Sequence, residues 1–133
     1  VLERLENINN LIDKRRGLAS VYDQILKPLE RRSLIKLPPK FSTNSSSIST
    51  YQNYEIQAED RDSLMQFLRE NQIGTIKQWG GFSIAHFKKL GFSIENYPST
   101  EKLFNKLLLL PLNHMMNVKE VEIVANKIVR FFD

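Results

Sequence analysis

The sequence predicts an α+β fold: a small, three-stranded, mainly antiparallel sheet covered by helices, with a long N-terminal helix alongside. Two observations indicate this fold. Apolar residues recur every three or four positions over residues 1–27, as on one face of a helix. After position 50, short segments with strand patterns alternate with helical segments. The 133 residues make one small domain, divided into a connecting helix (1–29), an irregular loop (30–50) and an α+β domain (51–133).

The first helix is expected to end near Lys27, because Pro28 stops a helix or kinks it. In the segment that follows, Pro38-Pro39 prevents regular structure, and we expect the polar run 42–49 to be a mobile surface loop rather than a linker between domains. A short extended piece is anchored by Leu34, Ile35 and Leu37. The chain begins inside a helical pattern and without Met, so we expect a piece of a longer protein.

Two strands and a helix are predicted in the middle of the chain. Residues 51–57 alternate between apolar and polar, as in a half-buried strand. Asp60 follows as the expected N-cap of a helix that covers residues 61–70. Residues 75–79 then read as a second strand, which delivers Trp79 to a Gly-Gly turn.

Two short helices are predicted after this turn. Ser83 is the expected N-cap of the first, and Gly91 is placed just past its C-terminus. The second opens at Pro98, with Ser99 or Thr100 as its N-cap.

The last third of the chain predicts a strand and a final helix. Leu107–Leu110 is a continuous apolar run, which fits a strand buried on both faces. A loop covers residues 113–116. Asn117 is then a good N-cap, with Glu120 at the capping-box position of a helix that runs to the last residue.

Composition excludes several classes of protein. The chain has no Cys, which excludes disulfide frameworks and thiolate metal sites, and its two His are not at metal-motif spacing. No apolar run approaches a membrane span, and no signal peptide is present, so we expect a cytoplasmic protein without membrane contact. The sequence holds no nucleophile elbow, phosphate loop or dinucleotide fingerprint.

The net charge of +4 comes from the first segment, because residues 1–40 hold nine Lys and Arg but only five Asp and Glu. One interpretation is an α+β interaction module without catalytic activity, whose basic helix binds an acidic partner or nucleic acid. The other is a solvated helix face, and the sequence favours it because no aromatic residues alternate with the charges.

Four residues around the Gly-Gly turn are the candidate site. Lys77, Gln78 and the only Trp, Trp79, stand at the end of the predicted strand, and His86 lies on the short helix that follows. A Gly-flanked strand end beside a His is typical of a pocket wall. The alternative, a buried Trp beside a tight turn and a His without a binding role, remains open at this point.

Several short motifs add a second line of argument because of their order: Tyr51-Gln-Asn-Tyr54-Glu-Ile56, Arg61-Asp62-x-Leu64, Gln72-Ile73-Gly74-Thr75, Tyr97-Pro98-Ser99-Thr100-Glu101 and Leu108-Leu-Leu-Pro111-Leu-Asn113. In this order they resemble the C-terminal small domain of the DegT/DnrJ/StrS aminotransferases. These are pyridoxal-phosphate (PLP) enzymes that act on nucleotide-linked keto-sugars. Gln78-Trp79 stands where many members carry His-Tyr, and His86 resembles the His that follows that pair.

The resemblance implies a fold-type I aminotransferase C-terminal domain and, in the intact enzyme, PLP, a homodimer and amino transfer to a nucleotide-linked sugar. The family's cofactor lysine lies in the large domain, which nothing here matches. We therefore expect this chain to bind no cofactor and to be inactive alone. Lys77, Gln78, Trp79 and His86 are expected to contact the substrate. Some relatives use the same cofactor for dehydration, and the residue that decides between the two reactions is not in this chain.

Overall fold

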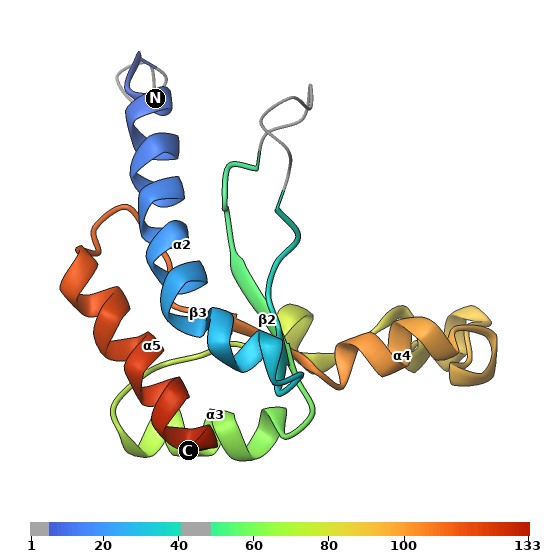
Figure 1. Cartoon of the computed structure of the whole chain (residues 1–133). Coiled ribbons are helices and arrows are strands. Elements are labelled where there is room, and N and C mark those ends of the chain that lie inside the picture. Colours follow the sequence, from blue (N-terminus) through green and yellow to red (C-terminus); the bar gives the residue numbers. More distant parts are fainter. Residues whose placement is uncertain (1–5, 41–48) are drawn as a thin grey trace.

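Three antiparallel strands form the sheet on which the other elements are arranged (Figure 1). The computed structural model describes residues 6–40 and 49–133. The strands β1 (Ile35–Lys36), β2 (Tyr54–Ala58) and β3 (Leu107–Leu110) lie in the order β1-β2-β3. The predicted α+β class, with its antiparallel three-stranded sheet and long first helix, is confirmed.

One face of the sheet is apolar because the strand pleat sends alternate side chains to it. Tyr54, Ile56 and Ala58 are buried along β2, whereas Glu55 and Gln57 between them are only partly buried. The partners of the three buried residues in the register are, in the same order, Leu110, Leu108 and Ile35. All six belong to the core, which therefore lies on one side of the sheet.

Helices cover this apolar face. The long helices α2 (Ile8–Arg31) and α5 (Val118–Phe132) pack side by side, and α3 (Arg61–Glu70) packs against α5 (Figure 1). Their contribution to the core is Leu18, Ala19, Tyr22, Leu26, Leu29, Leu64, Leu68, Val121, Val124, Ala125 and Ile128. The helix predicted at 61–70 and the Asn117–Glu120 capping box of the last helix are confirmed.

The first helix continues past Pro28 to Arg31, beyond the end expected from the sequence. A proline inside a helix costs about 3 kcal/mol, because it lacks the N–H group and its ring clashes with the preceding turn. Leu29, which is 1% exposed, offsets most of this cost, since burying a leucine stabilises a protein by about 1.5–3 kcal/mol. Tertiary packing therefore decides where the helix ends.

The predicted strand at residues 75–79 is wrong, because only Ile76 pairs there, in an isolated bridge to Leu109 of β3. Lys77 is still extended, but Trp79 and Gly80 adopt the left-handed conformation, which no strand accommodates. The third strand of the sheet is instead β1, the short extended piece expected within residues 30–50. Most of the polar run 42–49 lies outside the described residues.

Two other local predictions need correction. The helix expected after Ser83 is split into two 3-10 turns, η2 (Ile84–His86) and η3 (Lys88–Leu90), by the non-helical backbone of Phe87. Ser83 is nevertheless the N-cap of the first turn, and Gly91 adopts the left-handed conformation expected after the second.

The helix α4 begins one or two residues earlier than its predicted caps. It covers Pro98–Phe104, so Tyr97 is the N-cap and Ser99 and Thr100 lie inside the first turn. Proline suits the first helical position because its missing N–H would have no partner there anyway. Asp60, the cap predicted for α3, stands at the N-cap, but its side chain accepts no capping hydrogen bond.

Residues 82–104, here called the arm, project from the body of the protein (Figure 1). They contain η2, η3, η4 (Ile94–Asn96) and α4. Within the arm only Ser83 and Ala85 are buried. Its large apolar side chains are exposed, namely Phe82, Ile84, Phe87, Leu90, Ile94, Tyr97 and Leu103. The arm therefore offers an apolar surface that the body does not cover.

A buried polar contact joins α2 to β2. The Tyr54 hydroxyl donates to Asp23 Oδ1 at 2.7 Å, and Asp23 Oδ2 pairs with Lys40 Nζ at 3.2 Å. The rings of Tyr22 and Tyr54 lie 4.7 Å apart, and the Tyr22 hydroxyl donates to the Pro111 carbonyl at 2.8 Å. Burial raises the pKa of both tyrosines, and the bond to Asp23 raises the pKa of Tyr54 further. Both phenols therefore stay neutral in the folded protein at a pH where the unfolded chain ionises them.

We predict that Tyr54→Phe lowers the free energy of unfolding by about 1–3 kcal/mol, because the buried Asp23 carboxylate loses a donor. Urea denaturation followed by circular dichroism measures the change. Tyr97→Phe is the control, and its effect should stay within about 0.5 kcal/mol, because Tyr97 is exposed. An unchanged midpoint for Tyr54→Phe would contradict the assigned role of the bond.

Candidate functional site

The site begins where the chain leaves the sheet. Ile76 and Leu109 exchange two backbone hydrogen bonds, of 3.2 and 2.9 Å, which fix the start of the turn η1 (Gln78–Gly81) on the edge of β3. Trp79 (φ 52°, ψ 34°) and Gly80 (φ 67°) then both adopt left-handed backbone conformations, followed by Gly81 (φ 83°). This run of residues reverses the chain within one turn.

Trp79 is held outward by this turn, and 76% of its surface is exposed. A left-handed conformation costs a residue other than glycine about 1–2 kcal/mol. A tryptophan in water also leaves its large apolar surface unburied. Residues held in such sparsely populated backbone conformations cluster at functional sites. The alternative interpretation of the sequence, a Trp buried beside a tight turn, is therefore wrong.

An apolar hollow of about 650 Å³ lies beside Trp79. It is formed between η1, the start of the arm and α4. Its lining is Trp79, Phe82, Ile84, Phe87, Thr100 and Phe104. Thr100 contributes the only hydroxyl among otherwise hydrocarbon and aromatic side chains. Such a surface suits the flat or apolar part of a ligand.

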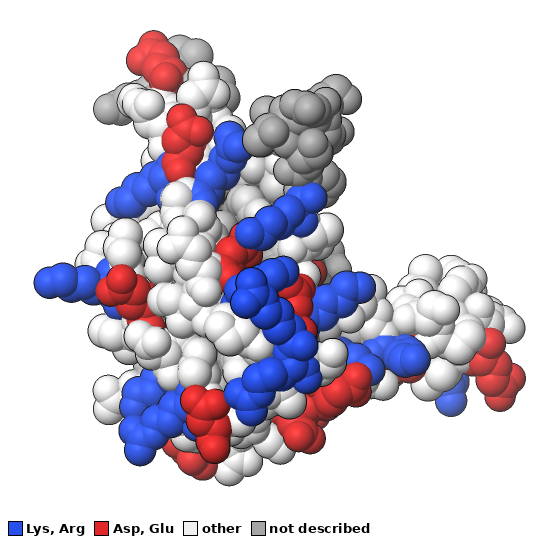
Figure 2. All heavy atoms as spheres, in the orientation of Figure 1, with Lys and Arg blue, Asp and Glu red and all other residues white. Residues whose placement is uncertain are grey.

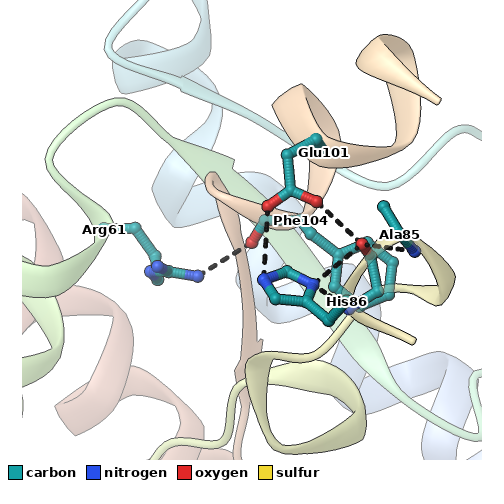
Figure 3. A network of polar contacts seen from close by, with 6 residues as sticks. Arg61, Ala85, His86, Glu101 and Phe104 are labelled. Atoms are coloured by element: carbon teal, nitrogen blue, oxygen red, sulfur yellow. Dashed lines mark hydrogen bonds and ion pairs between the residues drawn. The ribbon is translucent and has the colours of Figure 1, made fainter. Parts of the chain in front are cut away.

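A polar network ties η2 to α4 within the arm (Figure 3). The hydroxyl of Ser83, a residue that is only 1% exposed, donates to Glu101 Oε2 at 2.7 Å and accepts from the Ala85 N–H at 3.3 Å. His86 Nδ1 accepts from the Ser83 N–H at 3.2 Å, and its Nε2 faces Glu101 Oε1 at 3.7 Å. Since Ser83 is buried and donates to the carboxylate, the three side chains position the arm and do not form a nucleophilic triad.

Arg61 connects α3 to the arm, and Asp62 connects α3 to Lys77, which precedes the turn. Arg61, which is buried, donates to the Phe104 carbonyl at the end of α4 at 2.8 Å (Figure 3). Asp62 pairs with Lys77 at 2.7 Å and with Arg61 at 2.8 Å. Hydrogen bonds from Lys77 first and Arg61 second lower the pKa of the Asp62 carboxyl. These ion pairs therefore persist at neutral pH and weaken in acid, as the pH falls through this lowered pKa.

The four residues predicted for the site are near one another in the chain but have different surroundings. Trp79 lines the hollow, and Gln78 lies next to it in the same turn, half-buried. Lys77 is engaged by Asp62. His86 lies outside the lining and faces Ser83 and Glu101, with the ring of Phe82 edge-on at 5.6 Å.

Most of the hollow was not predicted from the sequence. Phe82, Phe87 and Phe104 supply aromatic surface, and Thr100 supplies the hydroxyl. The sequence gives only a weak signal for these aromatic residues. Phe82 follows the Gly-Gly turn and Phe87 lies in the predicted short helix, where a helical pattern leads one to expect apolar residues in the core. Only the projection of the arm shows that they face solvent.

Other kinds of site are not found in the described part of the chain. Residues 6–40 and 49–133 hold no group of three or more His, Cys, Asp or Glu able to bind a metal ion. Within the same ranges, no helix has the length and apolar character needed to cross a bilayer.

A family model for the DegT/DnrJ/EryC1/StrS aminotransferases matches residues 1–129. The chain belongs to this family. The match includes the first helix, the sheet and the Gly-flanked turn, so the resemblance seen in the motif order is confirmed. No curated protein is significantly similar in sequence.

Solved structures with this fold include TlmJ, an aminotransferase from Streptoalloteichus hindustanus, at a TM-score of 0.79 and 21% identity over 94% of this chain and 32% of that chain. Spr1654 from Streptococcus pneumoniae is assigned as a sugar aminotransferase and was solved in its PLP form. Its TM-score is 0.76 and its identity is 21%, over 96% of this chain and 32% of that chain. NtdA from Bacillus subtilis, with bound cofactor PMP, has a TM-score of 0.77 and 24% identity, over 97% of this chain and 30% of that chain. The chain therefore spans about a third of the length of these relatives.

The lining of the apolar hollow beside Trp79 does not fit the PLP cofactor. PLP reacts through its aldehyde with the amine of a lysine held in the pocket. None of the residues lining the apolar hollow is a lysine, and Lys77, which precedes the turn, is held by Asp62. We therefore assign no chemical step with PLP to this chain.

We predict that Glu101→Ala loosens the arm, because the buried Ser83 hydroxyl loses its acceptor at a cost of about 1–3 kcal/mol. Amide hydrogen exchange of residues 83–87 should become roughly tenfold faster, or more. The control is Glu95→Ala, which removes an exposed carboxylate from the same arm and should leave the exchange unchanged. Equal exchange rates in the two variants would show that the Ser83–Glu101 bond does not hold the arm.

Proposed function

We propose that this chain is the substrate-side domain of a PLP-dependent aminotransferase that transfers an amino group to a nucleotide-linked sugar. Membership in the aminotransferase family supports the reaction. The similarity to a protein assigned as a sugar aminotransferase supports the substrate class, and the PLP and PMP forms of relatives support the cofactor. The observation that carries the site is Trp79, exposed on left-handed backbone beside an apolar hollow.

The contacts follow from the chemistry of each side chain. The indole of Trp79 stacks on the flat apolar face of a sugar ring or a nucleobase. The amide of Gln78, in the same turn, both donates to and accepts from a sugar hydroxyl. Lys77 and His86 meet a phosphate only after they leave Asp62 and Glu101, so their part depends on ligand binding.

In this proposal the reactive cofactor belongs to a large domain outside this chain, and the chain alone is inactive. The exposed apolar side chains of the arm support such a division, because apolar side chains gathered on one surface mark an interaction site. Figure 2 shows the arm as mainly uncharged on the face in view. We further propose that the intact enzyme is a cytoplasmic homodimer, as the family resemblance implies. Whether it performs amino transfer or dehydration depends on residues outside this chain.

The alternative function, an interaction module with a basic helix, has less support. Figure 2 shows acidic side chains interspersed with the basic ones. Along α2, Arg16 pairs with Asp13 and Lys27 with Glu30, and Arg32 pairs with Asp133 at the C-terminus. Paired charges of this kind release few counterions, and nucleic acid binding depends on that release. We therefore expect no nucleic acid partner.

We predict that Trp79→Ala in the intact enzyme lowers kcat/KM for amino transfer to a nucleotide-linked keto-sugar by about 10- to 100-fold. The loss follows from the missing stacking surface, and steady-state kinetics with an amino donor measures it. Ile123→Ala is the control, because Ile123 is also an exposed apolar residue but lies on α5, away from the hollow. The proposal fails if Trp79→Ala and the control keep the same kcat/KM.

A separate measurement tests the position of the cofactor. The isolated chain mixed with PLP should show no stoichiometric absorbance change of the kind produced when PLP bonds to a lysine. A stoichiometric band would place the cofactor site on this chain and contradict the division into two domains.

A further inference from the structure

A second hollow, of about 420 Å³, lies on the side of the sheet opposite the core, and Leu103 of α4 forms part of its lining. The side chains of Asn53, Glu55 and Gln57 line it from β2 and the residues just before it. They alternate with the buried Tyr54 and Ile56, so the pleat turns them away from the core. None of the residues that line this hollow also lines the apolar hollow beside Trp79, and the proposal below does not rest on the proposed function.

Glu55 is the most unusual group in this second hollow. Its Oε1 atom is buried and accepts no hydrogen bond from the described residues. The cross-strand partner of Glu55 is Leu109, which offers only hydrocarbon. No described Lys or Arg forms an ion pair with Glu55, although Lys36 lines the same hollow. Burial alone raises the pKa of this carboxyl, which marks a charge without compensation.

A carboxylate in this situation gains most from a ligand that brings its own positive charge. Removing a charge from water costs several kcal/mol unless an opposite charge or strong donors replace the water. An ammonium group supplies both the charge and three donors. Glu55 lines the hollow, so a ligand in it reaches the carboxylate.

The flanking side chains suit hydroxyl groups. Asn53 and Gln57 carry amides, which donate and accept at once, as neighbouring hydroxyls on a sugar ring require. Tyr51 adds an aromatic wall, and its ring stacks on the buried Tyr54 at 6.2 Å, which fixes its place. Volumes of about 300–1,000 Å³ are usual for small-molecule sites, so a single sugar ring fits.

We propose that this hollow is a binding site for an amino sugar, with the ligand's ammonium group on Glu55 and its hydroxyls on Asn53 and Gln57. The ring of Tyr51 covers one face of the sugar. The neutral sugar of the same shape binds more weakly, because it leaves the Glu55 charge without a partner.

The experiment uses glucosamine as the probe, with glucose and methylammonium as matched ligands that lack either the charge or the ring. Binding to the full 133-residue chain is followed by amide chemical shifts in NMR titrations at neutral pH. The expected result is a millimolar Kd for glucosamine, or about −4 kcal/mol, with shifts at residues 53–57. Glucose and methylammonium should each bind at least about tenfold more weakly.

Variants separate the charge from the hydroxyl contacts. Glu55→Gln should weaken glucosamine binding at least about tenfold and leave glucose binding unchanged, while Asn53→Ala should weaken both sugars. Glu122→Gln, at an exposed position of α5, is the control and should change nothing. Asn53 is exposed, so its variant keeps the test informative even if Glu55→Gln does not fold.

Three outcomes would overturn the proposal. The first is the absence of shifts at residues 53–57 with glucosamine up to about 50 mM, far above a millimolar Kd. The second is unchanged glucosamine affinity in Glu55→Gln or, if that variant does not fold, in Asn53→Ala. The third is methylammonium binding as tight as that of glucosamine, which would indicate a simple cation site or a docking place for a lysine side chain.

Discussion

The structure depends on the packing of a single sheet face against α2 and α5. Tyr22 and Tyr54 meet at this junction, and Asp23 accepts the Tyr54 hydroxyl inside it. A buried carboxylate needs its donors, so the contact fixes the position of α2 along β2. Because the core lies on one side only, the other sheet face and the arm remain accessible. Both hollows lie in these accessible parts.

The arm shows how a segment with almost no core of its own keeps a defined shape. Polar contacts replace apolar packing there: Ser83 caps a turn and donates to Glu101, and Arg61 donates to the Phe104 carbonyl from α3. A buried hydrogen-bond network specifies one arrangement because each missing partner costs about 1–3 kcal/mol. His86 belongs to this network. The sequence predicts His86 as a substrate contact, and in this structure its ring faces Ser83 and Glu101 and does not line the hollow.

Elements with a strong local signal could be predicted from the sequence, and elements decided by tertiary contacts could not. The helix at 61–70, the strand Leu107–Leu110 and the Asn117 capping box follow from periodicity and capping chemistry. The prediction of a strand at 75–79 was wrong, because the alternation of apolar and polar residues does not reveal the left-handed backbone at Trp79. The site was predicted in part: Trp79 was found as a rare residue beside glycines, but the aromatic wall was not, because sequence patterns assume that apolar residues are buried.

Family membership and local geometry describe different properties of this chain: the first indicates the class of reaction, and the second the groups available to bind a ligand. The described residues provide a stacking surface, amides and an uncompensated carboxylate, which are groups that bind and orient. They provide no lysine in the hollow beside Trp79 that would hold an aldehyde cofactor. In the function proposed above, such a domain shapes the substrate side, and the cofactor that acts as electron sink belongs to polypeptide outside this chain. The exposed apolar side chains of the arm agree with that proposal, because apolar side chains gathered on one surface mark an interaction site.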